Sequence, residues 1–179
     1  MWRVAVVVLL VLVAAGLGVG WAKVDGGPAG SAAARAPARQ SSTLDSGDPE
    51  SPEGWRRVLS VLDARRGLAF AHADATLLDR VYLAGSRPLA ADVLAVRSLA
   101  AAGATAPGVR HEVTGLRVDS ADSRHAELQI TDRMPAYRIV GRGGAVLRSV
   151  PSRVERAFRV GLVGTEQGWR IVTITAVQR

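Results

Sequence analysis

Among the three His and 16 Asp or Glu residues of this 179-residue chain, His111 and Asp132 have the positions that could form an acid–base pair. His111 follows the two-residue period of Val109 and Val113, so it is expected to share their inward face of a strand. Asp132 follows Ile130 by two residues and shares its apolar face if the strand persists. A buried carboxylate beside an imidazole can transfer protons. The alternative is that Asp132 begins a turn and His111 is an edge residue whose hydrogen bonds are satisfied.

Three further polar side chains lie close to apolar segments. Tyr137 begins a short strand-like stretch, and Tyr82 follows a helical apolar stripe, which favours a core position with the hydroxyl at the rim. Asp92 directly precedes Val93 on a predicted helix, and we expect it to be solvent-exposed. No catalytic set emerges, and the candidates for a ligand pocket are His111, Asp132, Tyr137 and Tyr82.

Motifs for metal, phosphate or covalent chemistry are not found in the sequence. The chain has three His, without an HxH or HExxH spacing, and no Cys, so we expect neither a metal site nor a bound cofactor. The Gly-rich segment 141–144 lies between strands without a following helix, which indicates a hairpin turn.

The N-terminal segment, residues 1–23, is predicted to be a transmembrane anchor. Val4 to Ala22 carries no charge, and its 19 residues would span roughly 28 Å as a helix, close to the thickness of a bilayer core. Trp2 and Trp21 flank this stretch at the positions where interfacial aromatic residues occur. The chain is therefore expected to bind the membrane through a single N-terminal helix.

The orientation and processing of this segment leave alternatives. Arg3 favours a cytoplasmic N-terminus, which would place the C-terminal domain outside the cell membrane. Gly20 and Ala22 are small residues of the kind that precede a signal-peptide cut, so secretion after cleavage is the other interpretation. Gly16 and Gly20 have the GxxxG spacing that lets two membrane helices pack closely in a homodimer.

A linker and one domain follow the predicted anchor. Residues 24–52 are rich in Gly, Ala, Ser and Pro and are predicted to form a disordered tether. Residues 53–179 are enough for one domain with its own core. The net charge is +7, but the Arg residues are scattered without a run of five, so we expect no nucleic-acid binding.

The domain is predicted to begin with three helices. Ser51 caps the first, which runs to about Ala73, and Asp74 caps a short second one. The third covers residues 88–102, with its inward positions at Leu89, Val93, Val96, Leu99 and Ala100.

The rest of the domain is predicted to be a meandering antiparallel sheet. Gly115 interrupts the alternation of the first strand, which indicates a bulge. This order gives an α+β fold with N-terminal helices packed on a curved sheet. The expected strands are 109–120, 124–131, 137–141, 145–150, 153–163 and 169–177.

The domain resembles the NTF2-like (cystatin-like) superfamily, and in particular the single-pass mammalian-cell-entry-associated membrane proteins of high-GC bacteria. The resemblance rests on the order of anchor, tether, helices and strands, and on the ending Phe158–Val163, a turn, and Gly168-Trp169-Arg170-Ile171. It implies an NTF2-like cone, in which catalytic members place Asp, His or Tyr side chains. Fold alone does not assign an activity.

Two functions remain open from the sequence. The first is a membrane-anchored extracytoplasmic accessory domain without catalytic activity, which binds an envelope protein complex or a second copy of itself. The alternative is a small-molecule-binding or isomerase/dehydratase-type domain that uses the pocket of the cone.

Overall fold

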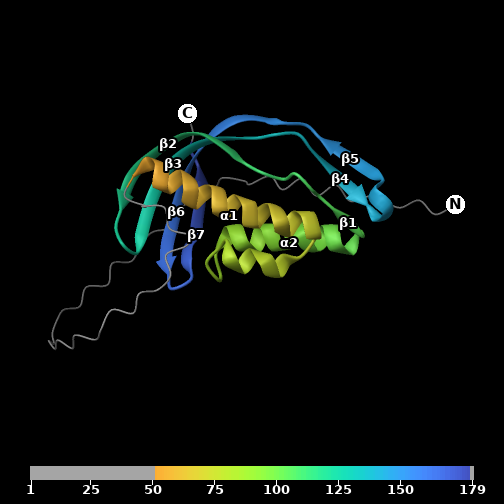
Figure 1. Ribbon diagram of the computed structural model, residues 1–179, viewed down its shortest axis with the longest axis horizontal. Helices are drawn as coiled ribbons and strands as arrows, with labels where there is room; N and C mark the ends of the chain where they lie inside the picture. Colours follow the sequence, from red (N-terminus) through yellow and green to blue (C-terminus); the bar gives the residue numbers. More distant parts are fainter. Residues whose placement is uncertain (1–50, 178–179) are drawn as a thin grey trace.

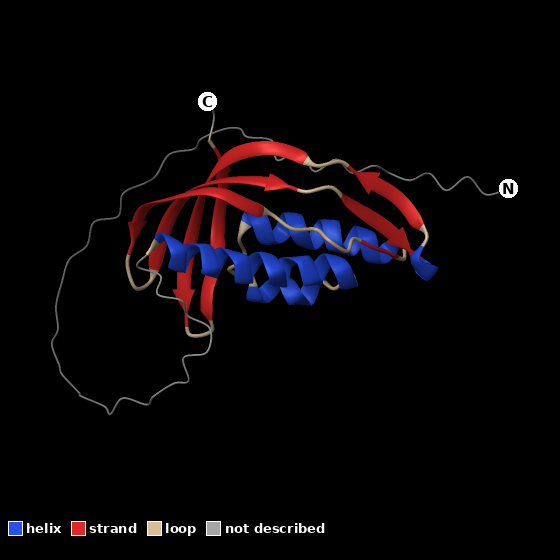
Figure 2. Cartoon of the chain, turned by 45° about the horizontal axis from the view of Figure 1, so that its top comes forward, coloured by secondary structure: helices blue, strands red, loops and turns tan. Residues whose placement is uncertain are grey.

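The computed structural model describes residues 51–177. Its helices lie on the concave side of bent antiparallel sheets, as Figures 1 and 2 show. The predicted anchor with Trp2, Gly16, Gly20 and Trp21, and nearly all of the linker, lie outside the described residues. Within residues 51–177, no helix has the length and apolarity needed to cross a membrane.

The first helix, α1 (Pro52–His72), begins and ends as predicted. The Ser51 side chain accepts a hydrogen bond from the backbone N–H of Gly54. Pro52 occupies the first turn, where a backbone N–H would have no acceptor within the helix, so its missing donor costs nothing. Ala73 ends the helix in the left-handed conformation. One side of α1 is buried, at Trp55, Val58, Leu59, Leu62, Ala69 and Phe70.

The other helical segments are η1 (Ala75–Arg80), a 3-10 helix, and α2 (Arg87–Ala101). Both predicted helices are confirmed, and Asp74 caps η1 by accepting from Thr76 N. Val96 is fully buried, whereas the predicted inward position of Ala100 is wrong because this residue is exposed on the last turn of α2.

Two antiparallel sheets follow, in place of the single meander that was predicted. The strands of the four-stranded sheet are, in spatial order, β2 (Glu112–Ala121), β3 (His125–Met134), β6 (Arg153–Thr165) and β7 (Gly168–Ala176). Those of the three-stranded sheet are β1 (Ala104–Thr105), β4 (Tyr137–Gly141) and β5 (Val146–Val150), with a 3-10 turn, η2 (Arg142–Gly144), between β4 and β5.

The predicted meander was wrong because β3 does not pair with the next strand along the chain. It pairs with β6, while β4 and β5 pair with each other beyond the end of β3 and β6. The chain leaves β3 at Pro135, makes the β4–β5 hairpin, and returns along β3 as β6, with Ile130 opposite Phe158. The two-residue strand β1 was missed because it is too short to show a period.

The strand predicted from Val109 begins three residues later, at Glu112. The preceding residues bond to α1 instead of a neighbouring strand: Ala106 N donates to Phe70 O, and His111 N donates to the Asp63 carboxylate. The predicted bulge is confirmed, since the register between β2 and β3 shifts from Val113 to Gly115.

The concavity between helices and sheets is filled by the domain's own apolar side chains. Leu128, Val160 and Leu162 are buried on the inner face of the sheet. The rings of Trp55 and Trp169 meet edge to face with their centroids 4.8 Å apart. Partly buried side chains of the hairpin, including Tyr137 and Ile139, complete this core.

Candidate functional site

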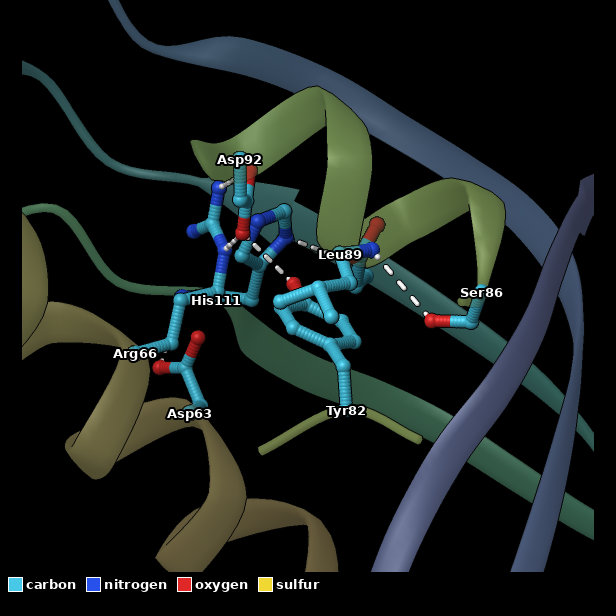
Figure 3. A network of polar contacts seen from close by, with 8 residues as sticks. Asp63, Arg66, Tyr82, Ser86, Leu89, Asp92 and His111 are labelled. Atoms are coloured by element: carbon cyan, nitrogen blue, oxygen red, sulfur yellow. Dashed lines mark hydrogen bonds and ion pairs between the residues drawn. The ribbon is translucent and has the colours of Figure 1, made fainter. Parts of the chain in front are cut away.

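A bidentate ion pair joins the two long helices inside the concavity. Arg66 on α1 donates from Nε to Asp92 Oδ2 at 2.6 Å and from Nη2 to Asp92 Oδ1 at 3.1 Å. Both side chains are largely buried, with exposures of 15% and 14%. This fork geometry fixes the guanidinium and carboxylate planes relative to each other. Figure 3 shows that Asp92, Arg66, Tyr82 and His111 converge from different elements.

Tyr82, in the segment after η1, makes a third hydrogen bond to the Asp92 carboxylate. Its hydroxyl donates to Asp92 Oδ2 at 2.6 Å, and the residue is buried. Leu83 N donates to Ile171 O, and Ile171 N donates to Val81 O, so this segment pairs with β7. Burial raises the pKa of the Tyr82 phenol, which therefore stays a neutral donor.

The sequence-based placement of Asp92 in solvent is wrong, and the core position of Tyr82 is confirmed. The Tyr82 hydroxyl does not reach the rim because Asp92 accepts from it. Asp92 lies three residues after Leu89 and four before Val96, which puts it on the apolar face of α2. This spacing indicates a buried position for Asp92. The expectation of exposure rested on the adjacent apolar residue Val93 instead of on this spacing.

Arg66 was not recognised as a candidate from the sequence. It lies four positions after Leu62 and four before Phe70, so it occupies the apolar stripe of α1. Its guanidinium lies 4.7 Å from the centroid of the Phe70 ring. Burial, the largest single effect, would lower the pKa of Arg66, but the charge and hydrogen bonds of Asp92 together with Tyr82 and Asp63 outweigh it and raise this pKa above its ordinary value. Within the described residues, Arg66 Nη1 is buried without a hydrogen-bond partner.

A second polar contact joins the segment before β2 to the inner face of β3. His111 Nδ1 lies 2.5 Å from Asp132 Oδ2. A carboxylate can only accept, so we place the proton on Nδ1. The His111 side chain is 32% exposed and that of Asp132 is 9% exposed. The turn interpretation of Asp132 is wrong, because β3 continues through Met134.

Asp63 links this contact to the first one. Its carboxylate accepts a hydrogen bond from His111 N at 2.9 Å, and it lies one helical turn before Arg66. Burial raises the Asp63 pKa, while the hydrogen bond from His111 opposes that shift. Three carboxylates, one guanidinium and one imidazole therefore meet between α1, α2 and β3.

The remaining sequence candidate, Tyr137, packs against the core and makes no polar contact with His111 or Asp132 among the described residues. A shallow, open depression of about 340 Å³ borders Tyr82 on another side, next to Arg170 and the β6–β7 turn. Neither His111, Asp132 nor Tyr137 lines it. Within residues 51–177, no three His, Asp or Glu side chains form a metal-binding group.

Comparisons with known proteins identify relatives in structure alone. No protein-family model matches the chain, and no curated protein matches its sequence. The intermembrane space region of the chloroplast protein ARC6 is similar with a TM-score of 0.53 and 17% identity, covering 72% of this chain and 98% of that one. This likeness shows a shared fold.

Two bacterial structures match more distantly. A putative dehydratase of the NTF2-like family from Streptomyces avermitilis has a TM-score of 0.45 and 11% identity, covering 70% of this chain and 97% of that one. An NTF2-like protein with a cystatin-like fold from Novosphingobium aromaticivorans has a TM-score of 0.40 and 19% identity, with coverages of 68% and 79%. The predicted α+β fold is confirmed, and the mammalian-cell-entry resemblance stays a prediction.

The ion pair between α1 and α2 yields a stability prediction. Asp92→Ala leaves the Arg66 charge buried without its carboxylate, and we expect a loss of about 3 kcal/mol in the free energy of unfolding. Asp79→Ala, which removes an exposed carboxylate, should change it by less than about 0.5 kcal/mol. Urea unfolding of the two variants measures both values, and equal losses would refute a special role for this pair.

The buried carboxylate of Asp63 yields a pH-dependence prediction. The folded chain holds the Asp63 proton more tightly than the unfolded chain, whose pKa is near 3.8. The stability that this proton provides is therefore complete below that value and is lost as the pH rises through the folded pKa. Asp63→Asn keeps an acceptor for His111 N without the charge.

We expect Asp63→Asn to be more stable than the wild type at neutral pH, and the difference to shrink toward acid pH. Urea unfolding across this range measures it. Glu53→Gln on the exposed first turn of α1 is the control, and a difference independent of pH would contradict the buried-charge explanation.

Proposed function

We propose that the chain is a membrane-anchored, extracytoplasmic accessory domain that acts by binding other molecules and not by catalysis. The packing of the concavity carries this proposal. The inner face of the sheet is covered by a continuous core that includes Trp55, Leu128 and Leu162. A catalytic pocket needs space beside its reactive groups, and here this space holds the domain's own side chains.

The polar groups inside the concavity support a structural role as well. Asp92 accepts from both Arg66 and Tyr82, and Asp132 is bonded to His111. Buried charges that neutralise each other in this way hold elements in a fixed arrangement. The contacts join α1, α2, β3 and the segment before β2, which makes the domain a rigid body suited to present its outer surfaces.

The membrane part of the proposal comes from the uncharged stretch of residues 4–22 and the linker after it. The structural likeness to the intermembrane space region of ARC6 adds support, since in that protein the fold serves as a region between membranes. A partner in the cell envelope, either a protein complex or a second copy of the chain, is the expected target.

Cell fractionation tests the location. We expect the full chain to stay in the membrane pellet after alkaline carbonate extraction, because a spanning helix resists extraction. Protease added outside spheroplasts should digest the C-terminal domain. Deletion of residues 4–22 is the matched change and should release the domain. Full-length protein recovered in the soluble fraction would overturn the anchor.

The His111–Asp132 contact favours a second candidate function, that of a small-molecule-binding or isomerase/dehydratase-type domain. Asp132 would hold the imidazole in one tautomer, so that Nε2 is left to accept or return a proton. The partial exposure of His111 is compatible with access for a ligand. Arg66 Nη1 would offer one unused donor nearby.

The tautomer of His111 tests this second candidate. Nitrogen-15 NMR at alkaline pH should show His111 protonated on Nδ1, a preference that Asp132→Asn weakens because the amide no longer requires a donor. His125, which is exposed and 3.9 Å from Asp122, is the internal control and should show no such preference. Titration with small carbonyl compounds should then shift the His111 and Ile130 signals, and the absence of shifts would exclude the candidate.

A further inference from the structure

The net charge of the domain is concentrated in one hairpin. Residues 51–177 contain 18 Arg and 12 Asp or Glu, a net charge of +6. Residues 137–156, which we call the arginine hairpin, contain five of these Arg and one acidic residue, a net charge of +4. This segment comprises β4, η2, β5 and the first residues of β6. About two thirds of the excess charge therefore lies in a small part of the chain.

The arginines of this hairpin make no ion pair within the described structure, whereas six arginines elsewhere do. Arg133 pairs with Glu112, and Arg117 pairs with Asp119. No acidic side chain of residues 51–177 lies within ion-pair distance of those in the hairpin, and all of them are exposed. They are Arg138, Arg142, Arg148, Arg153 and Arg156.

Exposed aliphatic side chains accompany these charges. Leu147 is 60% exposed and Val154 is 78% exposed, and Val146 beside them is also exposed. β5 is the outermost strand of its sheet, and nearly all of its side chains face solvent. Figures 1 and 2 show the β4–β5 hairpin extending beyond the four-stranded sheet at one end of the molecule.

We propose that the arginine hairpin docks onto the surface of an anionic lipid bilayer. Guanidinium groups bind lipid phosphates with charge-assisted hydrogen bonds, and aliphatic side chains between them can enter the boundary of the acyl chains. Each Arg near an anionic leaflet strengthens such binding by about fivefold. The combination of unpaired cations and exposed aliphatic residues in one hairpin fits this partner.

The composition of the hairpin favours a lipid surface over a nucleic acid. Single-stranded nucleic acids are bound through aromatic side chains on which bases stack. The one aromatic residue of the hairpin is Tyr137, and it packs against the core. The exposed residues at the edge are Val and Leu, which suit acyl chains.

The predicted anchor would favour the docked state without being required for it. The predicted linker of residues 24–52, with the reach of a chain of that composition, would hold the domain within roughly 30 Å of the bilayer, which would raise the effective concentration of the surface. The inference goes beyond the proposed function, because the hairpin could bind the same surface after cleavage of the N-terminal segment.

Hydrogen exchange of the full chain with nanodiscs tests the docking. The discs contain phosphatidylcholine with or without phosphatidylglycerol. We expect exchange in residues 146–154 to be slowed by the anionic discs alone, and this protection to disappear at high salt. Arg138→Gln, Arg148→Gln, Arg153→Gln and Arg156→Gln combined should weaken docking by several hundredfold, on the basis of about fivefold for each charge.

The matched control removes four exposed arginines elsewhere, at Arg56, Arg87, Arg97 and Arg124, and should retain the protection. Equal protection in both kinds of disc, or equal loss in both variants, would overturn the proposal. Hairpin-dependent protection by a DNA oligonucleotide but not by lipid would also overturn it in favour of a nucleic acid.

A structural role of the charges gives a different result. Arginines on an edge strand can simply prevent pairing with other chains. In that case the four-residue hairpin variant would self-associate in light scattering, while the wild type would show no lipid-dependent protection, and the proposal would fail. The hydrogen-exchange protection is measured in the hairpin alone, so its result is independent of the cell fractionation that tests the anchor.

Discussion

The ion pair between Arg66 and Asp92 is the interaction on which the arrangement of the helices depends. It joins α1 to α2 through two hydrogen bonds in a largely buried place. The Tyr82 hydroxyl joins the same carboxylate, and the segment around Tyr82 pairs with Ile171 on β7. One carboxylate thus connects two helices to the edge of the four-stranded sheet. An arrangement with either helix turned would leave a buried charge without its partner.

The same helix organises the other polar contact. Asp63 lies one turn before Arg66 on α1 and accepts from His111 N, which fixes the segment that leads into β2. His111 is thereby placed against Asp132 on β3. This explains why the extended segment before β2 does not pair with a neighbouring strand. The position of the imidazole is a consequence of helix packing, and a catalytic interpretation must account for this structural function first.

The sequence predicted the features that depend on neighbouring residues. The caps at Ser51 and Asp74, the bulge at Gly115 and the alternation along β3 are all local signals, and the structure confirms them. The pairing of β3 with β6 was not predicted, because it depends on a hairpin that extends the strands and leaves no mark on their periodicity. Arg66 was missed, and Asp92 was wrongly expected in solvent, for a related reason. Each is a single charged residue on the apolar face of its helix, and its charge is neutralised by a partner 26 residues away. The apolar pattern of one helix does not reveal a partner on the other.

The distribution of charge separates the interior of the domain from its surface. Inside, Arg66 is matched by Asp92, so this buried pair needs no external partner to be neutralised. Outside, most of the excess of arginine is gathered in the arginine hairpin, residues 137–156. The pairing of β4 with β5 presents arginines on both faces of the hairpin, since Arg138 lies opposite Ser149 and Arg148 lies opposite Ile139, one residue further along. A basic surface built in this way, on a domain whose concavity is filled, places recognition on the outer edge of the fold.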